Sequence, residues 1–221
     1  MFQDVDDSRQ QSANPVEQNS RYDYSLKWLL TLLVSSLAVV VAFFYLDVPV
    51  ASSVRGVLSS AQTLATGFAS AVLLSIESAV ALVLIVLRIT RGRLSLLGRA
   101  TMLACLTSIC GYAVNDATLK FFFGVAGPSA VLHGTRHAFH FFDGNSKSSF
   151  PSGHMALAGS FAGVFMRFYR RSILPLAVLL LIAAVLLVVG EWHFVSDVIA
   201  GTFIGVSAGL LAGELSIALT R

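Results

Sequence analysis

Long runs of apolar residues, separated by short polar segments, are the main pattern of this chain. Backbone polar groups inside a membrane must be bonded within their own segment, and the alternating pattern of a membrane barrel is absent, so these runs predict helices. A helix needs about 20 residues to cross the hydrocarbon core. Five runs reach that length, over residues 26–46, 67–90, 96–118, 172–190 and 198–219. A sixth run, 155–169, reaches it only if its helix begins near Ser152.

Composition agrees with this pattern. Hydrophobic residues make up 56% of the chain and charged residues only 12%, with a mean hydropathy of +0.78, which is too apolar for a protein surrounded by water. We therefore predict an all-α integral membrane protein in which residues 25–221 form a bundle of six transmembrane helices. Residues 1–24 are polar, lack the basic start and cleavage site of a signal peptide, and are predicted to form a disordered tail.

Basic residues predict the orientation of the bundle. They gather in two of the predicted loops rather than in one soluble patch, which argues against nucleic acid as a partner; these residues are Arg88, Arg91, Arg93 and Arg99, then Arg167, Arg170 and Arg171. Loops rich in arginine remain in the cytoplasm, so both termini are predicted to be cytoplasmic. Between the first two spans, residues 48–64 predict a helix lying on the outer membrane surface.

With this orientation, four residues whose side chains suit catalysis or anion binding lie at the same outer face of the membrane. Lys120 ends the third span, His154 opens the fourth, and His193 with Asp197 opens the sixth. His193 and Asp197 are one helical turn apart, so the carboxylate can accept a hydrogen bond from one ring nitrogen and leave the other nitrogen basic. An oriented histidine of this kind is typical of a nucleophile or a general base.

The last span places this pair on the packed side of the bundle. Its small residues follow a four-residue step, at Gly201, Gly205, Gly209 and Gly213, which lets another helix approach closely. Continuing the same step toward the N-terminus leads to Asp197 and His193, where a charged group is sheltered from lipid.

The segment Pro151-Ser152-Gly153-His154 predicts an anion site at the start of a helix. The first turn of a helix has unpaired amides, and Ser152 adds a hydroxyl beside them. Together with Lys120, one histidine held by Asp197 and a second histidine free to donate a proton, this set contains the parts of a phosphoryl transfer that needs no metal or other cofactor. A zinc site at His133, His137 and His140 is an alternative, although Gly134 disfavours the helix it would require.

These motifs resemble the type 2 phosphatidic acid phosphatase superfamily, which includes glucose-6-phosphatases and vanadium haloperoxidases. Its pattern is Lys, six residues and Arg-Pro; then Pro-Ser-Gly-His; then Ser-Arg, five residues, His, three residues and Asp. The resemblance implies that His193 forms a phosphohistidine, that Asp197 holds it and that His154 is the proton donor. It also implies that Lys120, Ser152 and Gly153 bind the substrate phosphate.

The first and third motifs diverge from that pattern. Gly127, before Pro128, replaces one arginine, and Leu186-Leu187 replaces Ser-Arg. In the superfamily these guanidinium groups hold the phosphate oxygens, a bidentate role that lysine fills poorly. Arg136 in the loop before Pro151 is the favoured replacement, with Lys147 as a second candidate.

We therefore predict a membrane phosphatase that hydrolyses a lipid phosphate or an isoprenoid pyrophosphate at the extracytoplasmic face, most simply of a bacterial inner membrane. One alternative is a catalytically weakened relative that binds a phosphorylated lipid or regulates a partner. Another is a transporter, suggested by Glu77 in the middle of the second span.

Overall fold

The computed structural model describes residues 15–58 and 60–219, and in this part of the chain all regular secondary structure is helical. The long helices follow the apolar runs, because a helix satisfies its own backbone groups. The elements are, in order, α1 (Pro15–Val41), η1 (Ala42–Leu46), α2 (Asp47–Val54), α3 (Ser60–Arg91), α4 (Leu96–Val114), η2 (Asn115–Leu119), α5 (Lys120–Phe123), α6 (Pro128–Leu132), α7 (Gly153–Phe168), η3 (Arg170–Ser172), α8 (Ile173–Val189) and α9 (Val195–Ala218).

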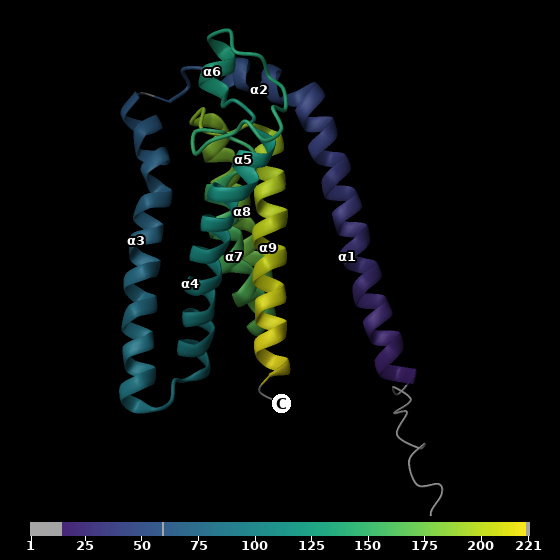
Figure 1. Ribbon diagram of the computed structural model, residues 1–221, viewed down its shortest axis with the longest axis vertical. Coiled ribbons are helices and arrows are strands. Elements are labelled where there is room, and N and C mark those ends of the chain that lie inside the picture. Colours follow the sequence, from purple (N-terminus) through teal and green to yellow (C-terminus); the bar gives the residue numbers. More distant parts are fainter. Residues whose placement is uncertain (1–14, 59, 220–221) are drawn as a thin grey trace, which may run out of the picture.

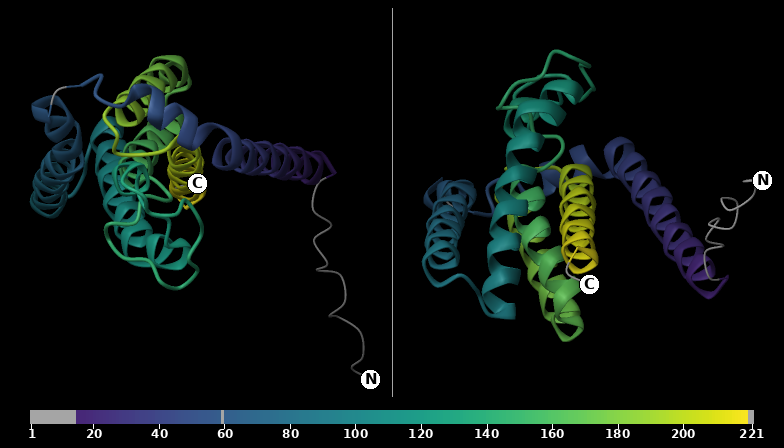
Figure 2. Two further views of the ribbon diagram at one scale, coloured as in Figure 1. Left: turned by 90° about the horizontal axis from the view of Figure 1, so that it is seen from above. Right: turned by 60° about the horizontal axis from the view of Figure 1, so that its bottom comes forward.

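Helices α4, α7 and α9 lie at the centre of the bundle, with α3 and α1 on opposite flanks (Figures 1 and 2). The most extensive helix contact is between α7 and α9. Glycines make this contact close: a β-carbon on Gly205 would lie 2.6 Å from the Ala156 carbonyl oxygen, and one on Gly209 would lie 2.2 Å from the Ser160 carbonyl oxygen. The predicted packing role of the four-residue glycine step is confirmed at these positions.

Five of the described helical segments are long and apolar enough to span a membrane: Ser25–Val54, Ser70–Arg91, Leu96–Leu132, Arg170–Val189 and Val195–Ala218. The run predicted as the fourth span forms α7, which has 16 residues. At the usual rise of a helix it is about 24 Å long, shorter than the roughly 30 Å hydrocarbon core. It packs mainly on α9 and α4, so its lateral surface is covered mostly by protein.

Three predictions differ from the structure. The helix expected over residues 48–64 ends at Val54, because the chain turns at Gly56, whose φ of +75° suits glycine. The next helix, α3, begins at Ser60 rather than near residue 67. Helix α1 begins at Pro15, inside the predicted polar tail of residues 1–24, while residues 1–14 of that tail lie outside the described part.

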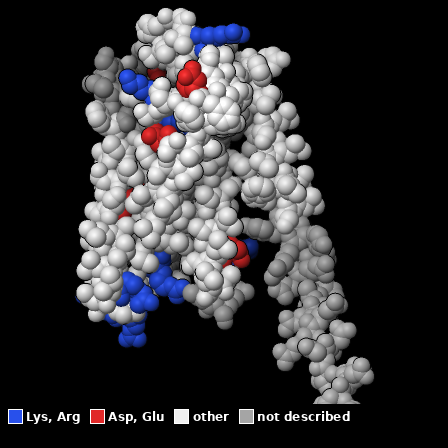
Figure 3. All heavy atoms as spheres, viewed as in Figure 1, with Lys and Arg blue, Asp and Glu red and all other residues white. Residues whose placement is uncertain are grey.

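The two ends of the molecule differ in character. One end carries α2, α5, α6 and the long loop that precedes α7 (Figure 1). At the other end lie the start of α1, the end of α9 and the connection between α3 and α4, where basic side chains gather (Figures 1 and 3). Arg88 and Arg91 lie in the last turn of α3 at that end.

Candidate functional site

His154, His193 and Asp197 form a continuous set of contacts. His154 Nδ1 lies 3.2 Å from His193 Nε2, and His193 Nδ1 lies 3.4 Å from Asp197 Oδ2. Asp197 is fully buried and His193 is 6% exposed, whereas His154 is partly exposed. The same Asp197 Oδ2 accepts a hydrogen bond from the Phe194 amide, at 2.8 Å, which fixes the carboxylate at the start of α9. The structure therefore brings together the three residues that the sequence singled out for catalysis.

The start of α7 lies against the start of α9. Ser152 is the N-cap of α7, where its hydroxyl accepts a hydrogen bond from the Met155 amide. The Ser152 amide in turn donates to the Asp197 carbonyl oxygen, at 3.1 Å. A β-carbon on Gly153 would lie 3.2 Å from the ring of Tyr112, so this position favours glycine through crowding. These contacts hold the first turn of α7, which carries His154, beside Asp197.

Lys120 has hydrogen-bond partners of its own. Its Nζ atom donates to Asp116 Oδ1 at 2.9 Å and to the Ser146 carbonyl oxygen at 3.2 Å. Lys120 follows a π-helical turn that begins at Asn115, a local change of helix geometry that is common near functional sites. Asn115 donates to the Pro151 carbonyl oxygen at 3.1 Å, which connects this turn to the start of α7. The Asp116 carboxylate offsets part of the positive charge that Lys120 would offer to an anion.

Arg136 is exposed in the loop between α6 and α7. None of the contacts recorded among the described residues joins it to the two histidines or to Asp197. Lys147, the second candidate, is also exposed. Gly127, which stands where the superfamily has an arginine, is the N-cap of α6.

Arg55 is a residue that the sequence interpretation missed. Its Nη2 atom lies 3.4 Å from His133 Nε2, next to α6. The amide of its neighbour Gly56 donates to Glu191 Oε1 at 2.9 Å, two residues before His193. Trp192, in the same turn, has its ring centroid 6.4 Å from that of His154. Arg55 therefore lies between α6 and the turn that carries His193, a neighbourhood that the sequence alone gives no signal for.

His137 is the loop histidine that reaches the buried side of this region. Its ring stacks on Phe43, at a centroid distance of 4.2 Å, and lies 4.5 Å from Phe194. Burial lowers the pKa of His137 below its ordinary value, while the negative charge of Asp197 acts in the opposite direction. A neutral His137 is therefore favoured in the folded protein.

A comparison with protein families matches residues 99–216, more than half of the chain, to the PAP2 superfamily. The chain belongs to this superfamily. The match includes α7 and most of α9, with all three residues of the contact set described above. PAP2 proteins are generally phosphatases, so activity on phosphate esters is the function that this membership suggests. The chain matches no curated protein and no solved structure.

Two other features of this PAP2 protein lie apart from the histidines. Glu77 is buried on α3, and its Oε2 atom has no hydrogen-bond partner among the described residues. No group of three or more His, Cys, Asp or Glu side chains in the described part is placed to hold a metal ion.

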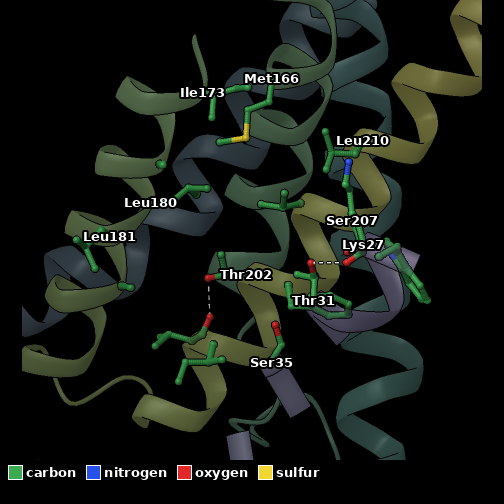
Figure 4. A pocket seen from close by; sticks show the side chains of 17 residues that line it. Lys27, Thr31, Ser35, Met166, Ile173, Leu180, Leu181, Thr202, Ser207 and Leu210 are labelled. Atoms are coloured by element: carbon green, nitrogen blue, oxygen red, sulfur yellow. Dashed lines mark hydrogen bonds between the residues drawn. The ribbon is translucent and has the colours of Figure 1, made fainter. Parts of the chain in front are cut away.

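A groove of about 710 Å³ runs between α1, α8 and α9 (Figure 4). Its lining comprises Lys27, Trp28, Thr31, Ser35, Met166, Ile173, Ala177, Leu180, Leu181, Ala184, Val198, Ile199, Thr202, Phe203, Val206, Ser207 and Leu210. The hydroxyls of Thr31 and Thr202 donate to carbonyls of their own helices, which leaves mainly hydrocarbon on the walls. The catalytic candidates do not line this groove, so it is not the phosphate site.

Proposed function

We propose that this PAP2 protein is a metal-independent membrane phosphatase that hydrolyses a lipid phosphate or an isoprenoid pyrophosphate at the extracytoplasmic face. The contact set from His154 through His193 to Asp197 is the observation that supports it. Its geometry suits a phosphohistidine mechanism, because the nucleophile, its orienting carboxylate and a proton donor are already adjacent.

In this mechanism Asp197 accepts the Nδ1 hydrogen of His193, which leaves a lone pair on Nε2. That lone pair attacks phosphorus, and the bond from phosphorus to the leaving oxygen breaks as His154 donates its proton to that oxygen. A water molecule then attacks the phosphohistidine, while His154 takes up one of its protons. The nitrogen–phosphorus bond breaks, inorganic phosphate leaves, and both histidines return to their starting states.

The distance between the two histidines implies that they separate when substrate binds. The nucleophile must approach phosphorus to about 3 Å, and the acid must lie about 3 Å from the leaving oxygen on the far side of the phosphorus. The two ring nitrogens must then be clearly farther apart than the 3.2 Å between His154 Nδ1 and His193 Nε2. His154 is the more exposed of the two rings, so we propose that it is the one that moves.

The phosphate oxygens would be bound by the first turn of α7, at Ser152 and Gly153, and by Lys120. Because Lys120 shares its charge with Asp116, a guanidinium group is still required for strong binding of the transition state. Arg136 was the candidate from the sequence. Arg55 is a second candidate for this guanidinium group, since its contacts and those of Gly56 connect it to the turn that carries His193.

For the membrane arrangement we propose six spans, with α7 as a short span inside the bundle and both termini in the cytoplasm. The gathering of arginines at the end opposite α2, α5 and α6 supports this orientation (Figure 3). In a bacterium the histidines would then face the periplasm or the exterior. Phosphorylated lipids at the outer leaflet are the corresponding substrates.

A second candidate function is a weakened relative that binds a phosphorylated lipid without turnover. Gly127 and Leu187 stand where the superfamily has arginines, and Lys120 is paired with Asp116. Both observations favour this second function.

The deciding experiment is phosphate release by the purified protein in EDTA, from phosphatidic acid and from an isoprenyl pyrophosphate. We expect turnover by the wild type and none by His193→Ala. Equal release by both proteins would contradict the mechanism. No release by the wild type, combined with saturable binding of the same lipids, would favour the second function.

A further inference from the structure

Asp47, at the start of α2, caps the first turn of α9 from outside that helix. The first amides of a helix have no partner within the helix, and the N-cap side chain usually accepts from one of them. The N-cap of α9 is Phe194, whose side chain has no acceptor atom. Asp47 Oδ1 instead accepts from the Ser196 amide at 2.9 Å, and Asp47 Oδ2 accepts from the Ser196 hydroxyl at 2.5 Å. Two segments far apart in the chain are thereby joined at one residue.

This connection is fully enclosed. Asp47 is 1% exposed, and Ser196 and Asp197 are both 0% exposed. A buried carboxylate loses its hydration, so it persists only where nearby donors compensate it. The two hydrogen bonds from Ser196 and the positive end of the α9 helix dipole offset part of this cost. His137 completes the surroundings, with its Nε2 atom 3.5 Å from Asp47 Oδ2.

Ser196 precedes Asp197, so the carboxylate that orients His193 projects from the turn that Asp47 holds. The contact from His193 Nδ1 to Asp197 Oδ2 is already long, at 3.4 Å, and a small rotation of this turn would remove it. Displacements of about 1 Å in a catalytic arrangement can lower rates by up to about 100-fold. The position of α2 is therefore coupled through Ser196 to the orientation of the nucleophile.

We propose that Asp47 is a positioning residue for the phosphoryl transfer: acting through Ser196, it fixes the first turn of α9 so that Asp197 orients His193. This inference rests on the proposed function. It adds to that function a residue from outside the segment matched to the superfamily, which begins at residue 99.

The test uses Asp47→Asn, which preserves shape, with Asp143→Asn as a matched control on an exposed loop. Activity is expressed per folded protein, measured by gel filtration in detergent. We expect Asp47→Asn to lower kcat about tenfold or more with KM changed less than twofold, and Asp143→Asn to change neither. A purely structural cap would lower the folded yield and leave kcat per folded molecule unchanged, and that result would overturn the proposal.

Two further measurements show whether the effect passes through Ser196. In a double-mutant cycle, Ser196→Ala should also lower kcat, and the combined variant should lose clearly less than the product of the two single effects. Full additivity would contradict the proposed route. Hydrogen–deuterium exchange of residues 194–199 should be faster in Asp47→Asn than in the wild type, with residues 208–213 unchanged.

The exchange measurement separates failure of this inference from failure of the proposed function. If the wild type releases no phosphate, the proposed function fails, and the exchange result still decides the role of Asp47 in holding α9. Unchanged exchange at residues 194–199 would overturn the inference, whether or not the protein has activity.

Discussion

His154 Nδ1 and His193 Nε2 are 3.2 Å apart, so the candidate acid and the candidate nucleophile are in direct contact. The contact joins the first turn of α7 to the turn that precedes α9, and the paired positions are 39 residues apart in the chain. Since the two rings have different proposed roles, replacing each with alanine should change the dependence of the rate on the leaving group in a different way.

His154→Ala should separate the acid from the nucleophile. We expect phosphate release from an alkyl phosphate to fall about 10²–10⁴-fold, because the leaving alkoxide then departs without a proton. The first-turnover release of p-nitrophenolate from p-nitrophenyl phosphate should fall far less, since nitrophenolate leaves readily as an anion. His193→Ala should lose turnover of both substrates. Equal losses on the two substrates with His154→Ala would argue that His154 is not the acid.

Asp197→Asn should lower kcat by about 10²–10⁴-fold, as a misdirected tautomer of the histidine would cause. Asp197 Oδ2 faces His193 Nδ1, and an amide nitrogen in its place would donate a hydrogen bond rather than accept one. Steady-state kinetics with Asp143→Asn as the control would measure this effect. A kcat within threefold of the wild type would show that Asp197 only caps α9.

Arg55→Gln and Arg136→Gln distinguish the two candidates for the missing guanidinium. We expect Arg55→Gln to lower kcat/KM about tenfold or more, because a charge-assisted contact to phosphate is lost, and Arg136→Gln to change it less than twofold. The measurement is kcat/KM on a pyrophosphate substrate, with Arg55→Lys to test bidentate binding. A larger loss of kcat/KM in Arg136→Gln than in Arg55→Gln would favour Arg136 as the phosphate-binding residue. Unchanged kcat/KM in both variants would favour a site without an arginine.

His137 should contribute a loss of thermal stability as the pH falls below about 6.5, the ordinary pKa of histidine. His137 has a lowered pKa in the folded protein, so the unfolded chain binds more protons in the acidic range and stability is lost as the pH falls. Asp47 and Asp197 are the charged groups near it. His137→Gln should reduce this pH dependence, measured as Tm in detergent from pH 7.5 to 5.5, while His140→Gln, on an exposed residue, should not. An unchanged slope in His137→Gln would contradict this explanation.

Gly209→Ala should destabilise the bundle by about 1–3 kcal/mol, the usual cost of excess volume in a packed interior. The new methyl group would meet the Ser160 carbonyl oxygen, which forces α7 and α9 apart. Unfolding in detergent would measure the loss, with Leu211→Ala on the exposed face of the same helix as the control. A Gly209→Ala variant as stable as the wild type would show that the two helices can separate at little cost.

The site was predictable from the sequence where its geometry is local. His193 and Asp197 lie one helical turn apart on one helix start, and the four-residue glycine step already places them on the packed side. The pairing of His154 with His193 required the added knowledge that successive spans alternate in direction. The resemblance to the superfamily followed from the segment Pro151-Ser152-Gly153-His154 and from the spacing of His193 and Asp197, which are short enough to be read along the sequence.

The candidate replacement for the lost arginines, Arg55, was not predictable in this way. Arg55 and Asp47 come from a segment with no motif, and their proposed roles rest on which surfaces meet: Gly56 with Glu191, and Asp47 with Ser196. The short α2 is another case, since its end at Val54 reflects the turn at Gly56 rather than any loss of apolar character.

By itself, the sequence determined that this is a helical membrane protein and which histidines and carboxylate form its candidate site, because hydrophobic length and helical periodicity act over neighbouring residues. Only the tertiary structure decided that Lys120 also donates to the Ser146 carbonyl oxygen and that Asp47 caps α9. Both contacts depend on the close approach of segments distant in the chain, which no local periodicity encodes.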